Sequence, residues 1–113
     1  MMQSEPTYSL SQMQSCIATG RYRITLMATN GAGEIGFRQR DICSCVLSLR
    51  REDFYKTMEA ERRPGFWQDV YRPRYRGRNI YLKVQLEGTT HDDIVVVVQF
   101  KQSTAIRDAD DMP

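Results

Sequence analysis

The chain has 113 residues, of which 41% are hydrophobic and 27% charged, and its formal net charge is +2. This length accommodates one domain with a single modest core, and the composition is that of an ordinary globular protein. The longest apolar run, residues 94–98, is far shorter than the roughly 18 residues that a membrane helix needs. Because the N-terminus lacks the basic and apolar regions of a secretory signal, we expect a cytoplasmic protein without membrane contact.

The positive charge is concentrated in the middle of the chain. Residues 50–83 carry ten Lys and Arg against five acids, whereas residues 84–113 carry two against six. Arginines and aromatic residues alternate in this segment, namely Arg63, Phe66, Trp67, Tyr71, Arg72, Arg74, Tyr75, Arg76 and Arg78. Guanidinium groups beside aromatic rings can hold the phosphates and bases of single-stranded RNA, although such a run can also be a solvated surface.

The chain begins with a predicted helix. Ser9 or Ser11 can cap a helix that runs through Ala18, and Gly20 is well placed to end it. The next short segment, residues 22–26, is β-prone.

The following segments complete a helix-rich first half. Residues 27–33 are ambiguous, because the Asn-Gly-Ala-Gly run at 30–33 could break a helix or form a loop. Apolar residues spaced by three or four then predict a helix over residues 40–49.

The three cysteines do not indicate a disulfide framework. Their number is odd, and Cys43 and Cys45 are separated by a single residue, which is also not a recognisable zinc spacing. We expect reduced thiols on or near an apolar helix face.

The second half of the chain changes to strand patterns. Residues 54–58 are predicted to form a strand, and residues 66–75 form a long β-prone run. Pro73 cannot donate a ladder hydrogen bond, so this run should bend or lie at an edge near its end. Residues 80–86 alternate strictly between apolar and polar, and residues 94–101 form the last strand.

Turns and the C-terminal tail bound these strands. The turns are expected at residues 64–65, at Gly77 and Asn79, and at residues 88–93. We expect residues 1–102 to form a single domain and residues 103–113 to form a flexible acidic tail.

Helices followed by a four-stranded meander predict an α+β fold, in which N-terminal helices pack on one face of a mainly antiparallel sheet. The alternation places Ile80 and Leu82 toward the core. Tyr81, Lys83 and Gln99 should lie on the other face with the arginine-rich strand, where a ligand can bind.

The sequence lacks the residue patterns of most enzymes. It has no P-loop, no nucleophile elbow, and no carboxylate or His/Cys cluster, so we expect no metal or cofactor. The single histidine, His91, is expected to be a solvated loop residue. Lysine, arginine, tyrosine and glutamine on strands remain, and these can support RNA cleavage, because the RNA supplies its own 2′-OH nucleophile.

Several segments closely resemble the MqsR toxins. They are residues 53–58 (DFYKTM), 66–74 (FWQDVYRPR), 80–84 (IYLKV) and 98–101 (VQFK), with residues 10–12 and 18–20 matching the family's opening helix. These toxins are messenger-RNA interferases with a RelE-like fold, each paired with a zinc-containing, DNA-binding antitoxin. The resemblance therefore implies single-stranded mRNA as substrate, an MqsA-like antitoxin as partner, and contact with DNA only through that partner.

The resemblance also implies the site residues. Those matching the family's functional positions are Lys56, Gln68, Tyr81 and Lys101. Those expected to bind RNA are Tyr55, Arg72, Arg74 and Arg76, with Arg72 on a phosphate. The loop before Lys101 is longer than the family pattern.

Our interpretation is a metal-independent endoribonuclease that cuts mRNA through 2′-OH attack and arrests growth. Two alternatives stay open at this point: a non-catalytic interaction module that serves only an antitoxin, and an RNA-binding protein that does not cleave. Incubation of the purified protein with a long single-stranded RNA separates the first interpretation from both alternatives.

Overall fold

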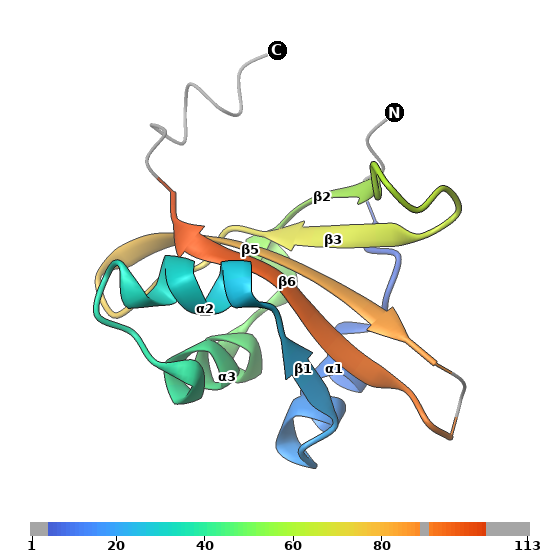
Figure 1. The fold of residues 1–113 in the computed structure, drawn as a ribbon, viewed down its shortest axis with the longest axis horizontal. Helices are drawn as coiled ribbons and strands as arrows, with labels where there is room; N and C mark the ends of the chain where they lie inside the picture. The colour runs from blue at the N-terminus through green and yellow to red at the C-terminus, as the bar shows by residue number, and fades with distance from the viewer. Residues whose placement is uncertain (1–4, 89–90, 104–113) are drawn as a thin grey trace.

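The computed structural model describes residues 5–88 and 91–103. Within these residues the chain forms three α-helices, one 3-10 turn and six strands, which make an α+β fold (Figure 1). In chain order they are α1 (Leu10–Ala18), β1 (Tyr22–Ile24), α2 (Leu26–Gly33), α3 (Gln39–Ser48), η1 (Arg51–Asp53), β2 (Phe54–Glu59), β3 (Trp67–Tyr71), β4 (Arg74–Tyr75), β5 (Arg78–Glu87) and β6 (Ile94–Gln102).

The sheet has the order β1-β6-β5-β3-β2, and the short β4 pairs with β5. The expected meander is confirmed, because β2, β3, β5 and β6 are antiparallel neighbours. The β-prone segment after α1 adds β1 at the edge, parallel to β6, so the sheet is mixed.

The first helix has the predicted ends. The Ser9 hydroxyl accepts a hydrogen bond from the Gln12 amide at 3.2 Å, which satisfies one free amide of the first turn. Gly20 follows with a φ of +78°, a left-handed conformation that glycine adopts without steric cost.

The ambiguous segment after β1 is a helix that lies along the edge of β6. Thr25 caps α2 by accepting from the Ala28 amide at 3.1 Å, and its hydroxyl donates to the Val98 carbonyl at 2.7 Å. A Cβ on Gly31 would lie 2.0 Å from the Phe100 carbonyl oxygen. The glycine that resembles a helix breaker in the sequence therefore lets α2 cover the β6 edge beyond the end of β1.

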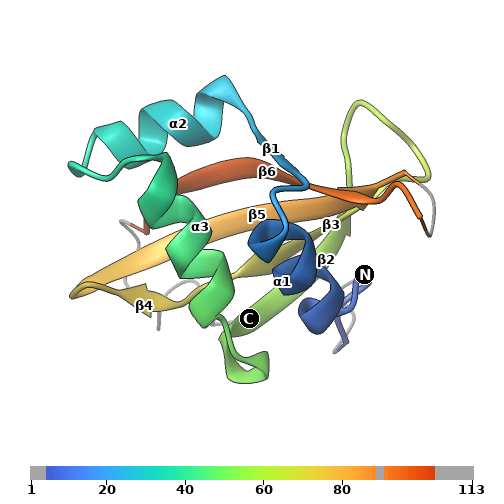
Figure 2. The ribbon, with the colours of Figure 1, turned by 90° about the horizontal axis from the view of Figure 1, so that it is seen from below.

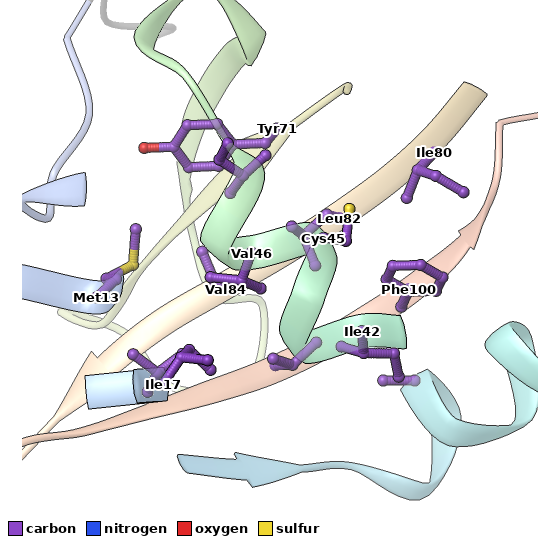
Figure 3. Packing of buried hydrophobic residues seen from close by; sticks show 14 of the residues in the cluster. Met13, Ile17, Ile42, Cys45, Val46, Tyr71, Ile80, Leu82, Val84 and Phe100 are labelled. Carbon is purple, nitrogen blue, oxygen red and sulfur yellow. The ribbon is translucent and has the colours of Figure 1, made fainter. Parts of the chain in front are cut away.

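The core lies between the helices and the sheet. In Figure 2, α1 and α3 lie in front of the strands while α2 lies beside β6. Figure 3 shows Ile42, Cys45 and Val46 of α3 among side chains of the strands. The fully buried members of this cluster are Met13, Cys16, Ala28, Ile42, Cys45, Val46, Tyr71, Ile80, Leu82, Val84, Val95, Val97 and Phe100.

The cysteines match the expectation of free thiols near apolar helix faces. Cys16 and Cys45 are buried on α1 and α3, and Cys43 is partly buried. Burial raises the pKa of Cys45 to about 12, and nearby Asp53 adds to this shift, so the thiol stays protonated.

The long β-prone run is divided at Pro73, as its position predicted. β3 ends at Tyr71, β4 begins at Arg74, and the Pro73 carbonyl accepts a hydrogen bond from the Ile80 amide at 2.9 Å. A two-residue turn then joins β4 to β5, with φ of +49° at Arg76 and +79° at Gly77. Two left-handed residues give the hairpin a twist that suits antiparallel strands.

The prediction of a turn residue at Asn79 was wrong. Asn79 lies in β5, where it pairs with Arg74, because the tight turn is completed before Arg78. The expected tail from residue 104 onward lies outside the described residues. No helix within the described ranges is long and apolar enough to cross a membrane.

Candidate active site on the open face of the sheet

Strand register places the candidate residues on one face of the sheet. Leu82 and Val84 point into the core, so Lys83 between them points to the opposite side. We call this side of β2, β3, β5 and β6 the open face. Across the strands, Lys56 pairs with Val70, Val70 with Lys83, and Lys83 with Gln99, so these side chains form one row.

A second row holds Gln68 in place. Gln68 pairs with Met58 on β2, and its amide donates a hydrogen bond to the Gln85 side chain on β5 at 2.9 Å. Gln85, which is only 5% exposed, donates in turn to Glu87. This chain of hydrogen bonds fixes the direction in which the Gln68 side chain points.

On the other side of the Lys83 row, Tyr81 and Lys101 are cross-strand partners on β5 and β6. The Lys101 Nζ lies 5.2 Å from the centre of the Tyr81 ring. A cation at this distance from a ring is attracted by its π electrons, so the pair forms one unit on the open face.

A β-bulge brings Tyr55 and Arg72 to the same region. The register of β2 and β3 shifts between Phe54 and Lys56, which leaves Tyr55 at the irregular position. The Arg72 guanidinium lies 4.6 Å from the centre of the Tyr55 ring, and the Lys56 Nζ lies 5.4 Å from it. Arg72 is only 3% exposed, so a nearly buried positive charge and Lys56 both lie near the Tyr55 ring.

The open face thus brings together six of the eight predicted site residues, and Arg74 and Arg76 lie apart from them. Arg74 is exposed on β4, where its guanidinium donates to the Asn79 side chain at 3.3 Å. Arg76 forms an ion pair with Asp41 of α3 at 3.1 Å, on the helix side. The tight turn after Tyr75 directs Arg76 toward α3, and its contact with RNA stays a prediction.

A groove of about 480 Å³ lies on the open face, beside the site residues gathered there. Its floor contains Gln68, Lys83 and Gln99, and one wall is Met27 at the start of α2, which is 61% exposed. The other wall is formed by Met58 near the end of β2 and by residues 60–63 in the loop that follows. The floor is polar and the walls are partly apolar, which suits a ligand with a charged backbone and flat bases.

Lysine is confined to this face. The chain has three lysines and thirteen arginines, and Lys56, Lys83 and Lys101 all project from the open face. The pKa of Lys83 is lowered, first by burial and then by the charge of Lys56, with a smaller effect of Lys101. Glu61 opposes these effects.

The sequence prediction placed Lys83 on the ligand face but not among the site residues. The scarcity of lysine beside so many arginines is the sequence signal that could have identified it. No comparable signal marks Met27 or residues 60–63, because only the folded chain brings them to the groove.

The single histidine and possible metal ligands are the remaining groups that the sequence analysis considered. His91 is exposed in the connection between β5 and β6. Among the residues that the structure describes, no three or more His, Cys, Asp or Glu side chains form a group that could hold a metal ion.

Comparisons with known proteins identify the family. The profile of a family described as "Motility quorum-sensing regulator, toxin of MqsA" matches residues 5–102. The chain is also 35% identical over 102 residues to the mRNA interferase toxin MqsR of Escherichia coli (strain K12), which covers 90% of this chain and 99% of that protein. The chain therefore belongs to the MqsR toxin family.

Proposed function

We propose that this mRNA interferase toxin cuts single-stranded mRNA on the open face of its sheet, through attack by the RNA's own 2′-OH and without a metal ion. The observation that carries the proposal is the convergence of Lys56, Gln68, Tyr81 and Lys101 on that face. These residue types supply positive charge, hydrogen bonds and exchangeable protons, which are the needs of this reaction.

In the reaction, the 2′-oxygen attacks the adjacent phosphorus, and the bond from phosphorus to the 5′-oxygen breaks. Negative charge grows on the phosphoryl oxygens in the transition state, where the ammonium groups of Lys56 and Lys101 would stabilise it. Gln68, held by Gln85, would orient the scissile unit, and the Tyr81 hydroxyl would hydrogen-bond to the phosphate. The products are a 2′,3′-cyclic phosphate and a 5′-hydroxyl.

The groove offers a path for the strand beyond the scissile phosphate. Arg62 and Arg63 are exposed in its outer wall, and the Arg63 guanidinium lies 3.8 Å from the centre of the Phe66 ring. Stacked guanidinium and aromatic groups bind both phosphates and unstacked bases of single strands. We extend the same proposal to the buried Arg72, which lies against the Tyr55 ring. The positive charge of Arg72 would face a phosphate beside Lys56.

The partner and the fold family belong to the same proposal. The matched family is described as the toxin of MqsA, which supports an MqsA-like antitoxin as partner. The family resemblance further implies that this antitoxin contains zinc and binds DNA, so that the chain would meet DNA only indirectly. The match over residues 5–102 supports one RelE-like ribonuclease domain, residues 1–102, with N-terminal helices packed on the sheet and a separate acidic tail, residues 103–113. Because mRNA is the substrate, we place the protein in the cytoplasm.

The test is incubation of the purified protein with a long single-stranded RNA in excess EDTA. We expect cleavage to continue, and mass spectrometry of the fragments to show 2′,3′-cyclic phosphate and 5′-hydroxyl ends. Cleavage that requires a divalent metal and leaves 5′-phosphate ends would contradict the proposal, because it indicates attack by activated water. RNA that stays intact would instead favour a non-catalytic module.

A further inference from the structure

We propose that Lys83 is a further catalytic residue, the general base that takes the proton from the attacking 2′-OH. This inference rests on the proposed function, because it assigns a role in the 2′-OH reaction. It goes beyond the residues implied by the family resemblance, none of which is Lys83.

The position of Lys83 is the first argument. It lies in the middle of the open face, in a row with Lys56 on one side and Gln99 on the other. Together with Gln68 it forms the floor of the 480 Å³ groove, and Tyr81 lies two residues away on the same side of β5. A phosphate bound between Lys56 and Lys101 therefore lies above Lys83.

The choice of lysine is the second argument. An arginine does not lose its proton at physiological pH, whereas a lysine can when its surroundings disfavour the charged form. The chain uses arginine for thirteen of its sixteen Lys and Arg residues and keeps lysine for the open face alone. Arginine also occurs on and beside this face, but only lysine can lose its proton there, so its confinement to the open face suits a role beyond positive charge.

The surroundings of Lys83 are the third argument. The charged groups that act on the pKa of Lys83 are Lys56 and Lys101, which lower it, and Glu61, which raises it. Tyr81 lies on the same side of β5, and Arg62 and Arg63 line the same groove, where Arg63 forms an ion pair with Glu87 at 3.2 Å. Lys83 is half-buried beside two other ammonium groups, so the burial and these two charges favour the neutral amine. The lowered pKa of Lys83 agrees with this balance.

The proton transfers balance as follows. The neutral Lys83 amine accepts the 2′-hydroxyl proton while the bond between the 2′-oxygen and phosphorus forms. The bond from phosphorus to the 5′-oxygen breaks, and the ammonium of Lys101 gives that oxygen a proton. Solvent then returns a proton from Lys83 to Lys101, so no oxidant, reductant or metal takes part.

The first test measures Lys83 directly. With lysine labelled by ¹³C, the unmodified protein gives only three lysine side-chain NMR signals, which Lys→Arg variants assign. In a pH titration without RNA, we expect Lys83 to lose its proton at a pH below the ordinary pKa of a lysine side chain. Titration of Lys83 at or above that ordinary value would overturn the inference.

The second test measures the reaction. Lys83→Arg keeps the charge but cannot become neutral and accept a proton at physiological pH, so single-turnover cleavage should fall roughly 10²-fold or more. The rise of the wild-type rate with pH should disappear, while binding of a 2′-O-methyl RNA stays within about 3-fold, since Arg keeps the charge that phosphates need. Arg50→Lys, the reverse exchange on an exposed residue after α3, is the control and should cleave normally.

The outcomes separate the two proposals. Full activity of Lys83→Arg beside an active wild type would overturn the role of Lys83 alone. A wild type that does not cleave RNA would overturn the proposed function and the catalytic role together. A melting temperature unchanged in Lys83→Arg would show that any loss of rate is not a loss of fold.

Discussion

Asp93 shows how one buried carboxylate fixes the start of β6. It accepts hydrogen bonds from the Gln12 side-chain amide and the Arg21 guanidinium, both at 2.6 Å, and the Cys16 thiol lies 3.5 Å away. These partners lower the pKa of Asp93, the Gln12 hydrogen bond most, although burial opposes them. The ionised carboxylate therefore ties α1 and the end of the hairpin loop together.

This arrangement predicts an acid-sensitive contribution to stability. A carboxyl group whose pKa is lower in the folded state stabilises fully above its unfolded pKa of about 3.9, and this stabilisation is lost as the pH falls through the folded value. We expect Asp93→Asn to lower the melting temperature at pH 7 and the difference from wild type to shrink below about pH 4. Thermal unfolding at several pH values measures it, and a difference that does not change with pH would contradict the prediction.

At the scale of single elements, α2 is the helix that the sequence alone could not assign. Its Asn-Gly-Ala-Gly ending resembles a loop, but Gly31 is needed because the helix lies against the backbone of β6. The closeness of two elements distant in sequence is a tertiary property, which local patterns do not contain. By contrast, the alternation in β5 and the apolar spacing in α3 were sufficient, since each depends only on which face is buried.

Gly31 gives a direct test of this packing. In Gly31→Ala the new methyl group would lie 2.0 Å from the Phe100 carbonyl oxygen, which belongs to the backbone and cannot move aside easily. We expect a loss of roughly 1–3 kcal/mol in the free energy of unfolding, measured by urea denaturation. Gly33→Ala, in the same helix with nothing within 4 Å of the new methyl, is the control and should not destabilise. Equal stability of both variants would show that α2 does not approach β6 this closely.

The candidate site was predictable only in part, because local sequence patterns do not show which distant segments meet in the folded chain. Segment resemblance identified Lys56, Gln68, Tyr81 and Lys101 by position, and strand register places them on one face. The arginine-rich run suggested a single surface, but Pro73 and the tight turn after Tyr75 break it, so Arg76 reaches α3 instead. A change of chain direction separates residues that are neighbours in sequence.

On the scale of the whole molecule, the sheet divides the chain into a helix side and an open side. Positive groups occur on both sides, so overall charge does not say where RNA binds. The groove places Arg62 and Arg63 beside the open face, whereas Arg40 lies on α3 and Arg50 follows that helix. Replacing arginines on the open side and replacing arginines on the helix side should therefore change the salt dependence of RNA binding differently.

Affinity for a 2′-O-methyl RNA should fall with salt concentration, with a slope of about −0.7 for each phosphate neutralised. We expect Arg62→Gln with Arg63→Gln to reduce the steepness of this slope by roughly 0.7 for each phosphate that the variant no longer neutralises. Arg40→Gln with Arg50→Gln changes the net charge equally and should leave the slope as in wild type.

A second double variant, Arg74→Gln with Arg76→Gln, tests the prediction that these two arginines bind RNA. A flatter slope in this pair would extend the RNA path to the turn between β4 and β5. An unchanged slope in the Arg62 and Arg63 variant would contradict our assignment of the groove as the RNA path.

The assignment of the active site to the open face is tested most directly by the variant Lys56→Ala. The measurement is the single-turnover rate at which this variant cleaves a long single-stranded RNA in EDTA. Loss of a charge-stabilising or proton-transferring group costs roughly 10²–10³ in rate, whereas a strand lysine outside the core changes stability by only about ±0.5 kcal/mol. We expect cleavage nearly abolished with a melting temperature within a few degrees of wild type, and normal cleavage by Arg50→Ala. Activity restored in Lys56→Arg would assign Lys56 the role of a charge, and continued loss would assign it a proton transfer or a specific shape. Cleavage by Lys56→Ala at the wild-type rate would contradict the assignment of the active site to this face.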